Sequence, residues 1–311
     1  MSDEKLPLIC ITGPTASGKT QLAAALAEQL DAAVISADSR QVYRGMDIGT
    51  GKDLSEYHIH GKQIPHYLID IRNAGEEYNV FEYQRDFAQI HHQLKAEGKN
   101  AILCGGSGMY VEAVLKNYAL HEVPVNEALR TSFAGKSMEE LTTLLQTYVR
   151  LHNNSDTETR ERLIRALEIQ IYYKENGIVQ KDDGPKHLLF YIDYPRKILR
   201  ERITQRLQQR LKEGMIEEVE QLLKSGLRKE QLTYYGLEYK FITLYLTGDI
   251  SYDDMVQRLN TAIHQFAKRQ ETWFRHMERK GSVLHRIDGC LDFDRKVELV
   301  LRKIGEHTKT Y

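Results

Sequence analysis

Hydrophobic and polar residues alternate along the first third of the chain in blocks that predict strands and helices in turn. Short apolar runs that end in glycine or polar residues are typical of buried strands, and longer segments carry apolar residues at helical spacing. The predicted strands are 6–12, 32–37, 66–71 and 101–104, and the predicted helices are 20–30 and 80–96. This order predicts βαβ units, hence a mostly parallel α/β sheet with helices on both faces.

The alternation stops near residue 121 and returns near residue 187. No convincing strand lies between these points, while 137–151 and 157–174 have helical patterns. We therefore predict an all-helical insertion domain at 121–186 within an α/β core made of 1–120 and 187–311. For the rest of this core the predicted strands are 187–193 and 283–287, and the predicted helices are 196–212, 215–224, 252–280 and 293–304.

The composition is that of an ordinary globular chain. Of 311 residues, 41% are hydrophobic and 28% are charged, which excludes a disordered or collagen-like chain. The 43 Lys and Arg residues balance 44 Asp and Glu residues, so a uniformly basic coat is excluded but a local basic face is not. Three distant cysteines, Cys10, Cys104 and Cys290, argue against a disulfide framework or a zinc site. The absence of a leader or a long apolar run predicts a cytoplasmic protein without a membrane span.

Residues 13–20 read GPTASGKT and fit the P-loop pattern G-x-x-x-x-G-K-[ST] of ATP-binding and other nucleotide-binding proteins. A predicted strand precedes them and a predicted helix follows. Backbone N–H groups and the positive end of the helix would cradle phosphates, with Lys19 on bridging oxygens and Thr20 on Mg²⁺. The motif predicts a bound di- or triphosphate without specifying it. Its members are Gly13, Pro14, Thr15, Ala16, Ser17, Gly18, Lys19 and Thr20.

The acidic residue expected of a P-loop hydrolase is missing from its usual place. Such enzymes carry an acid after a second strand to support Mg²⁺ and the attacking water, but here strand 101–104 is followed by Gly105 and Gly106. Asp38 instead follows strand 32–37, where it would face the ligand crevice of an open sheet. It could hold a metal, accept a proton from a nucleophile, or simply form a turn or helix cap.

Six segments in this order resemble the bacterial tRNA dimethylallyltransferases, also called tRNA isopentenyltransferases. They are GPTASGKT, DSRQVYRGMDIGTGK, PHYLIDI, GGSGMYVEAVL, RLIRALEI and KRQETWFR, and the resemblance runs over roughly residues 8 to 280. It implies a P-loop NTPase-like core with a helical insertion that contacts tRNA. It also implies Mg²⁺-dependent transfer of a dimethylallyl group from dimethylallyl diphosphate to N6 of adenine 37, beside the anticodon of tRNA, with release of diphosphate.

The resemblance also implies roles for individual residues. The P-loop would hold the donor diphosphate, and Asp38 would be the general base. Ser107 stands where the family has Thr in G-G-T-G-x-Y and would contact the departing diphosphate, which Arg206 would also support. Transfer of this kind needs no nucleotide hydrolysis, in agreement with the missing acid after residue 104.

Binding of an anticodon stem-loop needs a local basic surface because the net charge is −1. Arg202, Arg206 and Arg210 form one helical stripe that predicts either a phosphate-binding edge or a solvated charged face. A stacked adenine must be extruded to reach Asp38, and Ser39 and Gln41 could hydrogen-bond its edge. We expect a monomer. The residues predicted to bind tRNA are Asp38, Ser39, Arg40, Gln41, Arg162, Arg165, Lys268 and Arg269.

Three other functions use the same motifs. A P-loop small-molecule kinase would use Asp38 as the base for a small acceptor, and a prenyltransferase of free AMP would need no RNA. The insertion and the KRQETWFR helix argue against both, since a small acceptor leaves them unexplained. A P-loop switch without transfer chemistry would keep its RNA affinity after Asp38→Ala. Two departures from the family pattern, His264 and the segment 233–236, weaken residue-level expectations for tRNA contacts there but leave the catalytic core untouched.

Overall fold

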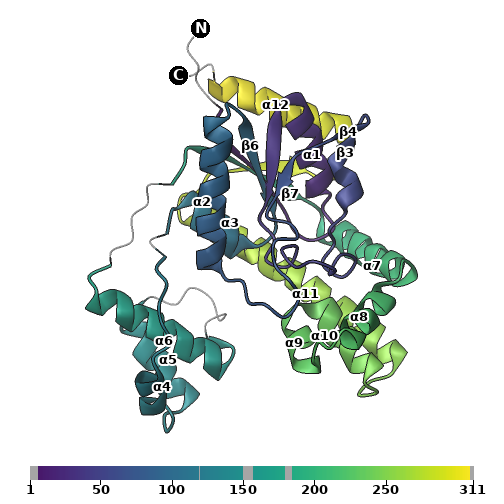
Figure 1. The fold of residues 1–311 in the computed structure, drawn as a ribbon. Helices are drawn as coiled ribbons and strands as arrows, with labels where there is room; N and C mark the ends of the chain where they lie inside the picture. Colours follow the sequence, from purple (N-terminus) through teal and green to yellow (C-terminus); the bar gives the residue numbers. More distant parts are fainter. Residues whose placement is uncertain (1–5, 119, 150–156, 179–183, 309–311) are drawn as a thin grey trace. The chain divides into compact units, whose positions relative to one another are not determined.

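The computed structural model describes residues 6–118, 120–149, 157–178 and 184–308. Contacts divide the chain into two compact units, one made of 1–116 with 184–311 and the other of 117–183. The first unit carries the sheet and the second is helical (Figure 1).

Six parallel strands form the sheet of the larger unit. Their order is β5 (His66–Tyr67), β2 (Ala32–Ser36), β6 (Asn100–Gly105), β1 (Leu8–Thr12), β7 (His187–Asp193) and β8 (Leu284–Asp288). All five residues of the central β1 are buried, as expected for a parallel strand covered on both faces. The predicted fold class is therefore confirmed.

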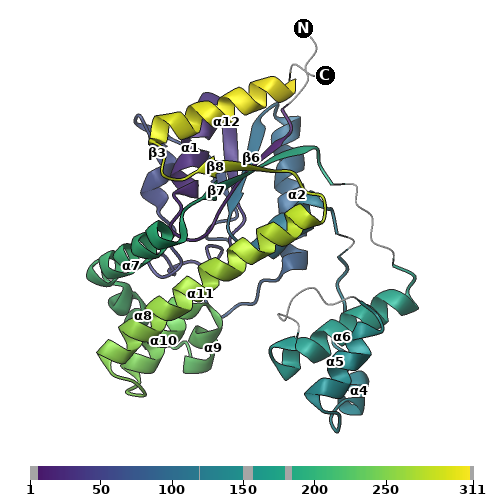
Figure 2. The same cartoon turned by 180° about the vertical axis from the view of Figure 1, so that it is seen from behind.

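Helices cover both faces of this sheet (Figures 1 and 2). Side chains of β1 alternate between two cores: Ile9 and Ile11 pack with α1 (Lys19–Gln29) and α12 (Phe293–Thr308). Leu8 and Cys10 belong to the other core, together with helices of the opposite face. Those helices are α2 (Val80–Ala96), α3 (Gly108–Leu115) and α11 (Tyr252–Arg279).

Four further helices join the second of these cores. Ile203, Val219 and Ile242 are buried representatives from three of them. The helices are α7 (Arg196–Lys212), α8 (Met215–Lys224), α9 (Lys229–Tyr234) and α10 (Leu237–Leu246). On α11, Phe274 is 1% exposed and its ring centroid lies 5.3 Å from that of Tyr191, so it belongs to this core.

The segment after β2 differs from its prediction. The strand expected at 66–71 is only two residues long, because Leu68 and Asp70 adopt positive φ angles of 61° and 56° that no strand accommodates. Ahead of it lie elements that the sequence pattern did not predict, since each is four residues or fewer. They are the 3₁₀ helix η1 (Leu54–Tyr57) and the hairpin of β3 (His58–Ile59) and β4 (Lys62–Gln63).

The smaller unit has its own core, in which Phe133, Leu141 and Leu163 are buried. Its helices are α4 (Glu127–Ser132), α5 (Met138–Gln146) and α6 (Arg160–Glu175). The helix predicted at 137–151 ends at Gln146, and residues 150 and 151 lie outside the described part. The helix predicted from 157 begins at Arg160, because the Thr159 side chain accepts from Arg162 N and caps it.

No helix in the described part of the chain combines the length and the apolar character that a membrane span requires.

Candidate active site

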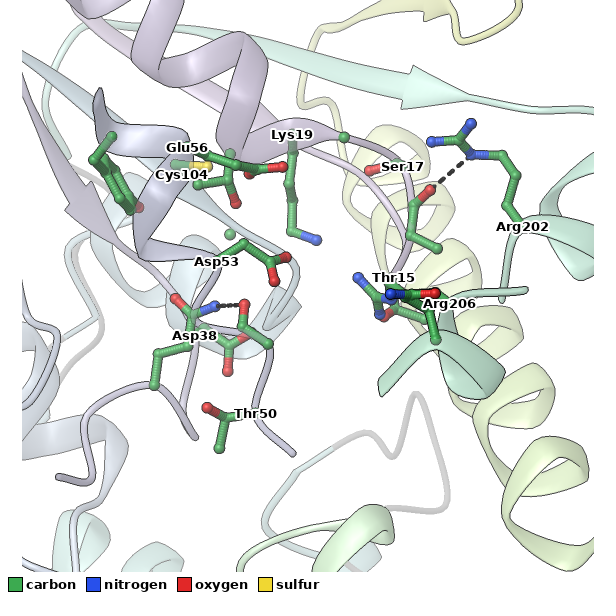
Figure 3. Close-up of a pocket in the computed structure, with 18 of the residues that line it drawn as sticks. Thr15, Ser17, Lys19, Asp38, Thr50, Asp53, Glu56, Cys104, Arg202 and Arg206 are labelled. Carbon is green, nitrogen blue, oxygen red and sulfur yellow. Dashed lines mark hydrogen bonds between the residues drawn. The ribbon is translucent and has the colours of Figure 1, made fainter. Parts of the chain in front are cut away.

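A pocket of about 470 Å³ lies at the carboxyl ends of the central strands, where open parallel sheets bind their ligands. Side chains from segments far apart in the sequence converge on it (Figure 3). It is lined by 15–20 of the P-loop, Asp38 and Gln41 after β2, part of 50–57, Cys104 and Gly105 of β6, and one face of α7 from Arg202 to Gln209.

The P-loop has the backbone that an anion cradle needs. Gly13 has φ 155°, and a Cβ at this position would lie 2.9 Å from Ser17 Oγ, so no larger residue fits. Helix α1 starts directly after the loop and adds its positive end. Lys19 Nζ donates to Pro14 O at 3.4 Å, and burial lowers the pKa of this ammonium. An anion bound beside Lys19 would offset that desolvation.

Two arginines of α7 complete the cationic side of the pocket. Arg206 donates to Thr15 Oγ1, and Arg202 Nε donates to Ala16 O at 2.9 Å. Burial, together with repulsion from Arg210, lowers the pKa of Arg206 to about 10, which leaves it charged at neutral pH. Both guanidinium groups therefore reach the P-loop.

Arg210 does not share this arrangement, which corrects its place in the predicted phosphate-binding stripe. It is 7% exposed and contacts the Asp53 carboxylate at 3.4 Å. Its guanidinium occupies the space beside Gly51, where a Cβ would approach it to 2.3 Å. Arg210, eight residues after Arg202, points inward because α7 packs on the loop that contains residues 51–53. Its guanidinium therefore supports this loop.

A buried amide on α11 connects the P-loop to the loop after β6. Gln270 Oε1 accepts from Thr15 N at 2.8 Å, and its Nε2 donates to Gly106 O at 2.9 Å. A Cβ on Gly106 would lie 2.4 Å from that nitrogen. Sequence reasoning chose Lys268 and Arg269 on this helix and missed Gln270. The signal was available, because Gln270 lies in the apolar stripe of α11 that contains Ala267 and Phe274.

Asp38 and Ser107 lie on neighbouring loops. Asp38 Oδ1 accepts from Arg40 N at 2.9 Å, which is turn chemistry, and its side chain also lines the pocket. Ser107 Oγ accepts from Ser39 N at 3.2 Å. The two loops can lie this close together because residue 105 is glycine. A Cβ at this position would lie 2.1 Å from Ala37 O. The hydroxyl of Ser107 thus supports the segment that carries Asp38.

Both ends of the Gln41 amide are hydrogen-bonded within this wall. Its Oε1 accepts from Ser36 Oγ at 3.0 Å, and its Nε2 donates to Gly51 O at 2.9 Å. The amide has a second N–H and a second acceptor position, so these two bonds leave capacity for a hydrogen bond to an adenine.

The 47–53 segment is held by two side chains that sequence reasoning missed. Glu218 of α8 accepts from three successive backbone amides, Asp47 N at 2.8 Å, Ile48 N at 2.7 Å and Gly49 N at 3.1 Å. Lys52 is buried and donates to Asp47 at 2.8 Å. These bonds fix one wall of the pocket to α8. A motif search cannot find Glu218, because acids at helical spacing have no distinguishing pattern.

The other predicted RNA contacts lie outside the pocket. The Arg40 guanidinium lies 5.1 Å from the ring centroid of Tyr234. Lys268 lines a second pocket of about 1080 Å³ between α7, α11, β7 and β8. The Arg269 guanidinium lies 5.9 Å from the ring centroid of Phe266.

Two predicted RNA contacts belong to the smaller unit and have acidic partners there. Arg162 pairs with Glu158 at 2.6 Å on the surface. Arg165 donates to Glu168 at 3.1 Å and to Val123 O at 2.7 Å. Burial favours a raised pKa for Glu168, but hydrogen bonds from Arg130, Asn126 N and Arg165 outweigh it and lower the pKa to about 2. Arg165 is therefore part of a network within this unit, while its side chain remains 37% exposed.

The pocket offers oxygen ligands suited to Mg²⁺. The Thr20 hydroxyl and the carboxylates of Asp38, Asp53 and Glu56 all line it. Within the described ranges, no three His, Cys, Asp or Glu side chains are grouped to hold a metal by themselves. This donor set fits Mg²⁺, which usually binds through one or two protein oxygens together with substrate phosphates and water.

Formal charges in the pocket are balanced, with Lys19, Arg202 and Arg206 facing the three carboxylates. Glu56 changes this balance near neutral pH. Burial, reinforced by the charge of Asp53, raises the pKa of Glu56 to about 7. Below that pH the pocket has a net positive charge, as an anion-binding site requires.

Comparison with known proteins assigns this architecture to a family. The family model for IPP transferase matches residues 41–277. The chain is 54% identical over 307 residues to tRNA dimethylallyltransferase 2 of Phocaeicola vulgatus, covering 98% of this chain and 99% of the relative. It is also 54% identical over 296 residues to tRNA dimethylallyltransferase 1 of Parabacteroides distasonis, covering 95% and 96%.

Solved structures agree with this assignment. A full-length tRNA isopentenylpyrophosphate transferase from Bacillus halodurans superposes with a TM-score of 0.71 at 30% identity, covering 98% of this chain and 99% of the other. A eukaryotic dimethylallyltransferase acting on tRNA has a TM-score of 0.72 at 22% identity, covering 91% and 73%, and shares the fold.

Pyrophosphate binding should depend on the charge of Glu56. In EDTA, wild-type affinity should fall as pH rises through about 7, because the carboxylate that forms there repels the anion. Glu56→Gln should remove this part of the profile and bind more tightly above pH 7, by on the order of tenfold for one nearby like charge. Calorimetric titration over the pH range measures both profiles, and the ionisation of pyrophosphate itself is common to them.

Glu201→Gln removes an exposed acid from α7 outside the pocket and is the matched control. It should reproduce the wild-type profile. Parallel profiles for wild type and Glu56→Gln would show that Glu56 does not titrate against the bound anion.

Proposed function

This chain belongs to the IPP transferase family, and from that premise we propose that it transfers a dimethylallyl group from dimethylallyl diphosphate to N6 of adenine 37 of tRNA. Diphosphate is the other product. The observation that carries the proposal is one pocket that combines a P-loop, two arginines and the Asp38 carboxylate. The sequence GGSG at the end of β6 has no acid to support hydrolysis.

The donor diphosphate would lie on the P-loop, from Gly13 to Thr20. Lys19, Arg206 and the loop N–H groups would stabilise the charge that grows on the departing diphosphate. Thr20 would hold Mg²⁺, with a pocket carboxylate as a further oxygen ligand, and the ion would neutralise phosphate charge. Ser107 would act at the same end of the donor, beside the segment 37–39 that it supports.

The acceptor amine is a weak nucleophile because its lone pair is delocalised into the adenine ring. As N6 forms its bond to the prenyl carbon, the bond from that carbon to the diphosphate oxygen breaks. Asp38 would accept the N6 proton, which requires a carboxylate within hydrogen-bond reach of the flipped base. Its position at the end of β2, beside the cationic pocket, supports this role.

The RNA would extend from the pocket across nearby polar and basic groups. Asp38, Ser39, Arg40 and Gln41 are the proposed contacts beside the reacting base. Lys268 and Arg269 on α11, and Arg162 and Arg165 on α6, are proposed contacts farther along the tRNA. We also propose that the protein acts as a monomer. We place the reaction in the cytoplasm, with its tRNA substrate.

The direct test mixes the protein with Mg²⁺, dimethylallyl diphosphate and an unmodified anticodon stem-loop that carries adenine 3′ to the anticodon. Nuclease digestion and mass spectrometry should find adenosine heavier by one dimethylallyl group. A stem-loop with guanosine at that position is the matched control and should stay unmodified. ATP consumption on a small acceptor, with no prenylated RNA, would instead assign the P-loop to phosphoryl transfer.

Asp38→Asn should abolish most turnover while keeping the affinities for donor and stem-loop. The amide retains the acceptor oxygen for Arg40 N but is no longer basic. We expect a loss of about 10²–10⁴-fold in kcat, the usual contribution of general base catalysis. Single-turnover prenylation measures the chemical step, and calorimetry measures binding.

Asp53→Asn and Glu56→Gln are the matched carboxylate controls, because all three acids line the same pocket. Each should lose less in the chemical step than Asp38→Asn, because neither is proposed to accept the N6 proton. The opposite result would reassign the base. If kcat of one of these variants falls by about 10²–10⁴-fold while Asp38→Asn turns over at nearly the wild-type rate, the base is that other carboxylate.

Arg206→Ala should weaken use of the donor by roughly 10²–10³-fold in kcat/KM, the usual effect of removing one charged or preorganised donor from a developing anion. Lys197→Ala, an exposed position of the same helix outside both pockets, is the control and should behave as wild type. A change confined to the salt dependence of stem-loop binding would place Arg206 on the RNA backbone instead.

A further inference from the structure

Tyr234 is a large aromatic residue that the protein leaves in solvent. It ends α9 and is 53% exposed, while its neighbour Tyr235 is 3% exposed. The packing of α9 does not need the Tyr234 ring, because Leu232 and Tyr235 already join the core. An exposed aromatic without a packing role is a candidate contact for a partner.

The ring of Tyr234 has a rigid support. It lies edge-on to Tyr235, with ring centroids 5.7 Å apart and an interplanar angle of 80°. Tyr235 is held in turn by its hydroxyl, which accepts from Gly75 N at 2.6 Å and donates to Glu76 O at 3.2 Å. It also packs edge-on against buried Tyr43, with centroids 4.6 Å apart. Tyr234 is therefore fixed before any partner binds.

Arg40 gives this exposed ring a charge and places it near the reaction site. Its guanidinium lies 5.1 Å from the centroid of Tyr234. Its backbone N–H donates to Asp38 Oδ1 at 2.9 Å. The backbone of Arg40 thus contacts the carboxylate that lines the pocket, and its side chain contacts the exposed ring of Tyr234.

We propose that Tyr234 and Arg40 form a stacking platform for a nucleobase that flanks the reacting adenine. This inference rests on the proposed function and adds a subsite to it. Unstacked RNA bases are recognised by stacking on aromatic rings and on arginine planes, with the positive charge near the phosphates. Extrusion of one adenine breaks the stack of its neighbours, and a platform beside Asp38 would replace the lost stacking partner.

The test compares Tyr234→Leu with Tyr234→Trp, because leucine keeps apolar bulk but no π face and tryptophan keeps the face. Stem-loops carry 2-aminopurine immediately 5′ or 3′ of the reacting adenine. Binding to the wild type should quench the probe at one of these positions, and Tyr234→Leu should relieve the quenching. Tyr234→Leu should also weaken stem-loop binding roughly 5- to 150-fold, the range for one base–aromatic stack.

Tyr252→Leu is the matched control. Tyr252 is 44% exposed, contacts Tyr245 at 5.7 Å between ring centroids, and starts α11 outside the pocket. It should retain wild-type stem-loop affinity and quenching. In Tyr234→Leu the KM for dimethylallyl diphosphate and the affinity for pyrophosphate should stay unchanged, while the KM for the stem-loop rises. Tyr234→Trp should restore both quenching and affinity.

Three results would overturn the platform. The first is equal stem-loop affinity and quenching in wild type and Tyr234→Leu. The second is a loss that Tyr234→Trp does not restore or that extends to pyrophosphate, as a structural defect would. The third is a loss of stem-loop affinity in Arg40→Ala alone, together with a weaker dependence of that affinity on salt concentration. This result would indicate that Arg40 contacts a phosphate. Failure of the proposed function is distinct, since the wild type itself would then prenylate no RNA.

Discussion

One buried side-chain amide holds the active site together. Gln270 accepts from the P-loop and donates to the loop after β6, so helix α11 fixes both loops at the carboxyl edge of the sheet. Its amide replaces water for two backbone groups that would otherwise be buried without partners. A site made of loops from four separate segments needs such a connection, because positions of catalytic groups must hold to a fraction of an ångström.

Charge compensation is the second constraint on this pocket. Lys19 and Arg206 are both desolvated, and the pKa of each is lowered by burial. Uncompensated cations at this depth cost stability, and the carboxylates of Asp53 and Glu56 partly offset that cost before ligand binds. On the proposed function, a donor diphosphate would then replace the carboxylates as the partner of these cations. The raised pKa of Glu56 allows that acid to lose its charge as the anion enters.

The sequence pattern predicted the sheet, the P-loop and the long helices because each has a strong local signal. α2, β7, α7 and α8 have the residue bounds that periodicity predicts. The hairpin at 58–63, helix α9 and the short β5 were missed or misjudged, since their form depends on contacts made elsewhere in the chain. The same limit applies to the site: Lys19 belongs to a motif, whereas Glu218 acquires its role only where α8 meets the 47–49 amides.

The geometry also explains how a P-loop can serve transfer of an alkyl group. Hydrolases place an acid beside the terminal phosphate to position water, but here Gly105 and Gly106 occupy that place, and their lack of side chains lets the loop lie against Ala37 and Gln270. The carboxylate comes instead from the end of β2, at Asp38. In the proposed reaction, moving the acid from one strand end to its neighbour would shift the reactive position away from the phosphorus atom, toward the carbon that the diphosphate leaves.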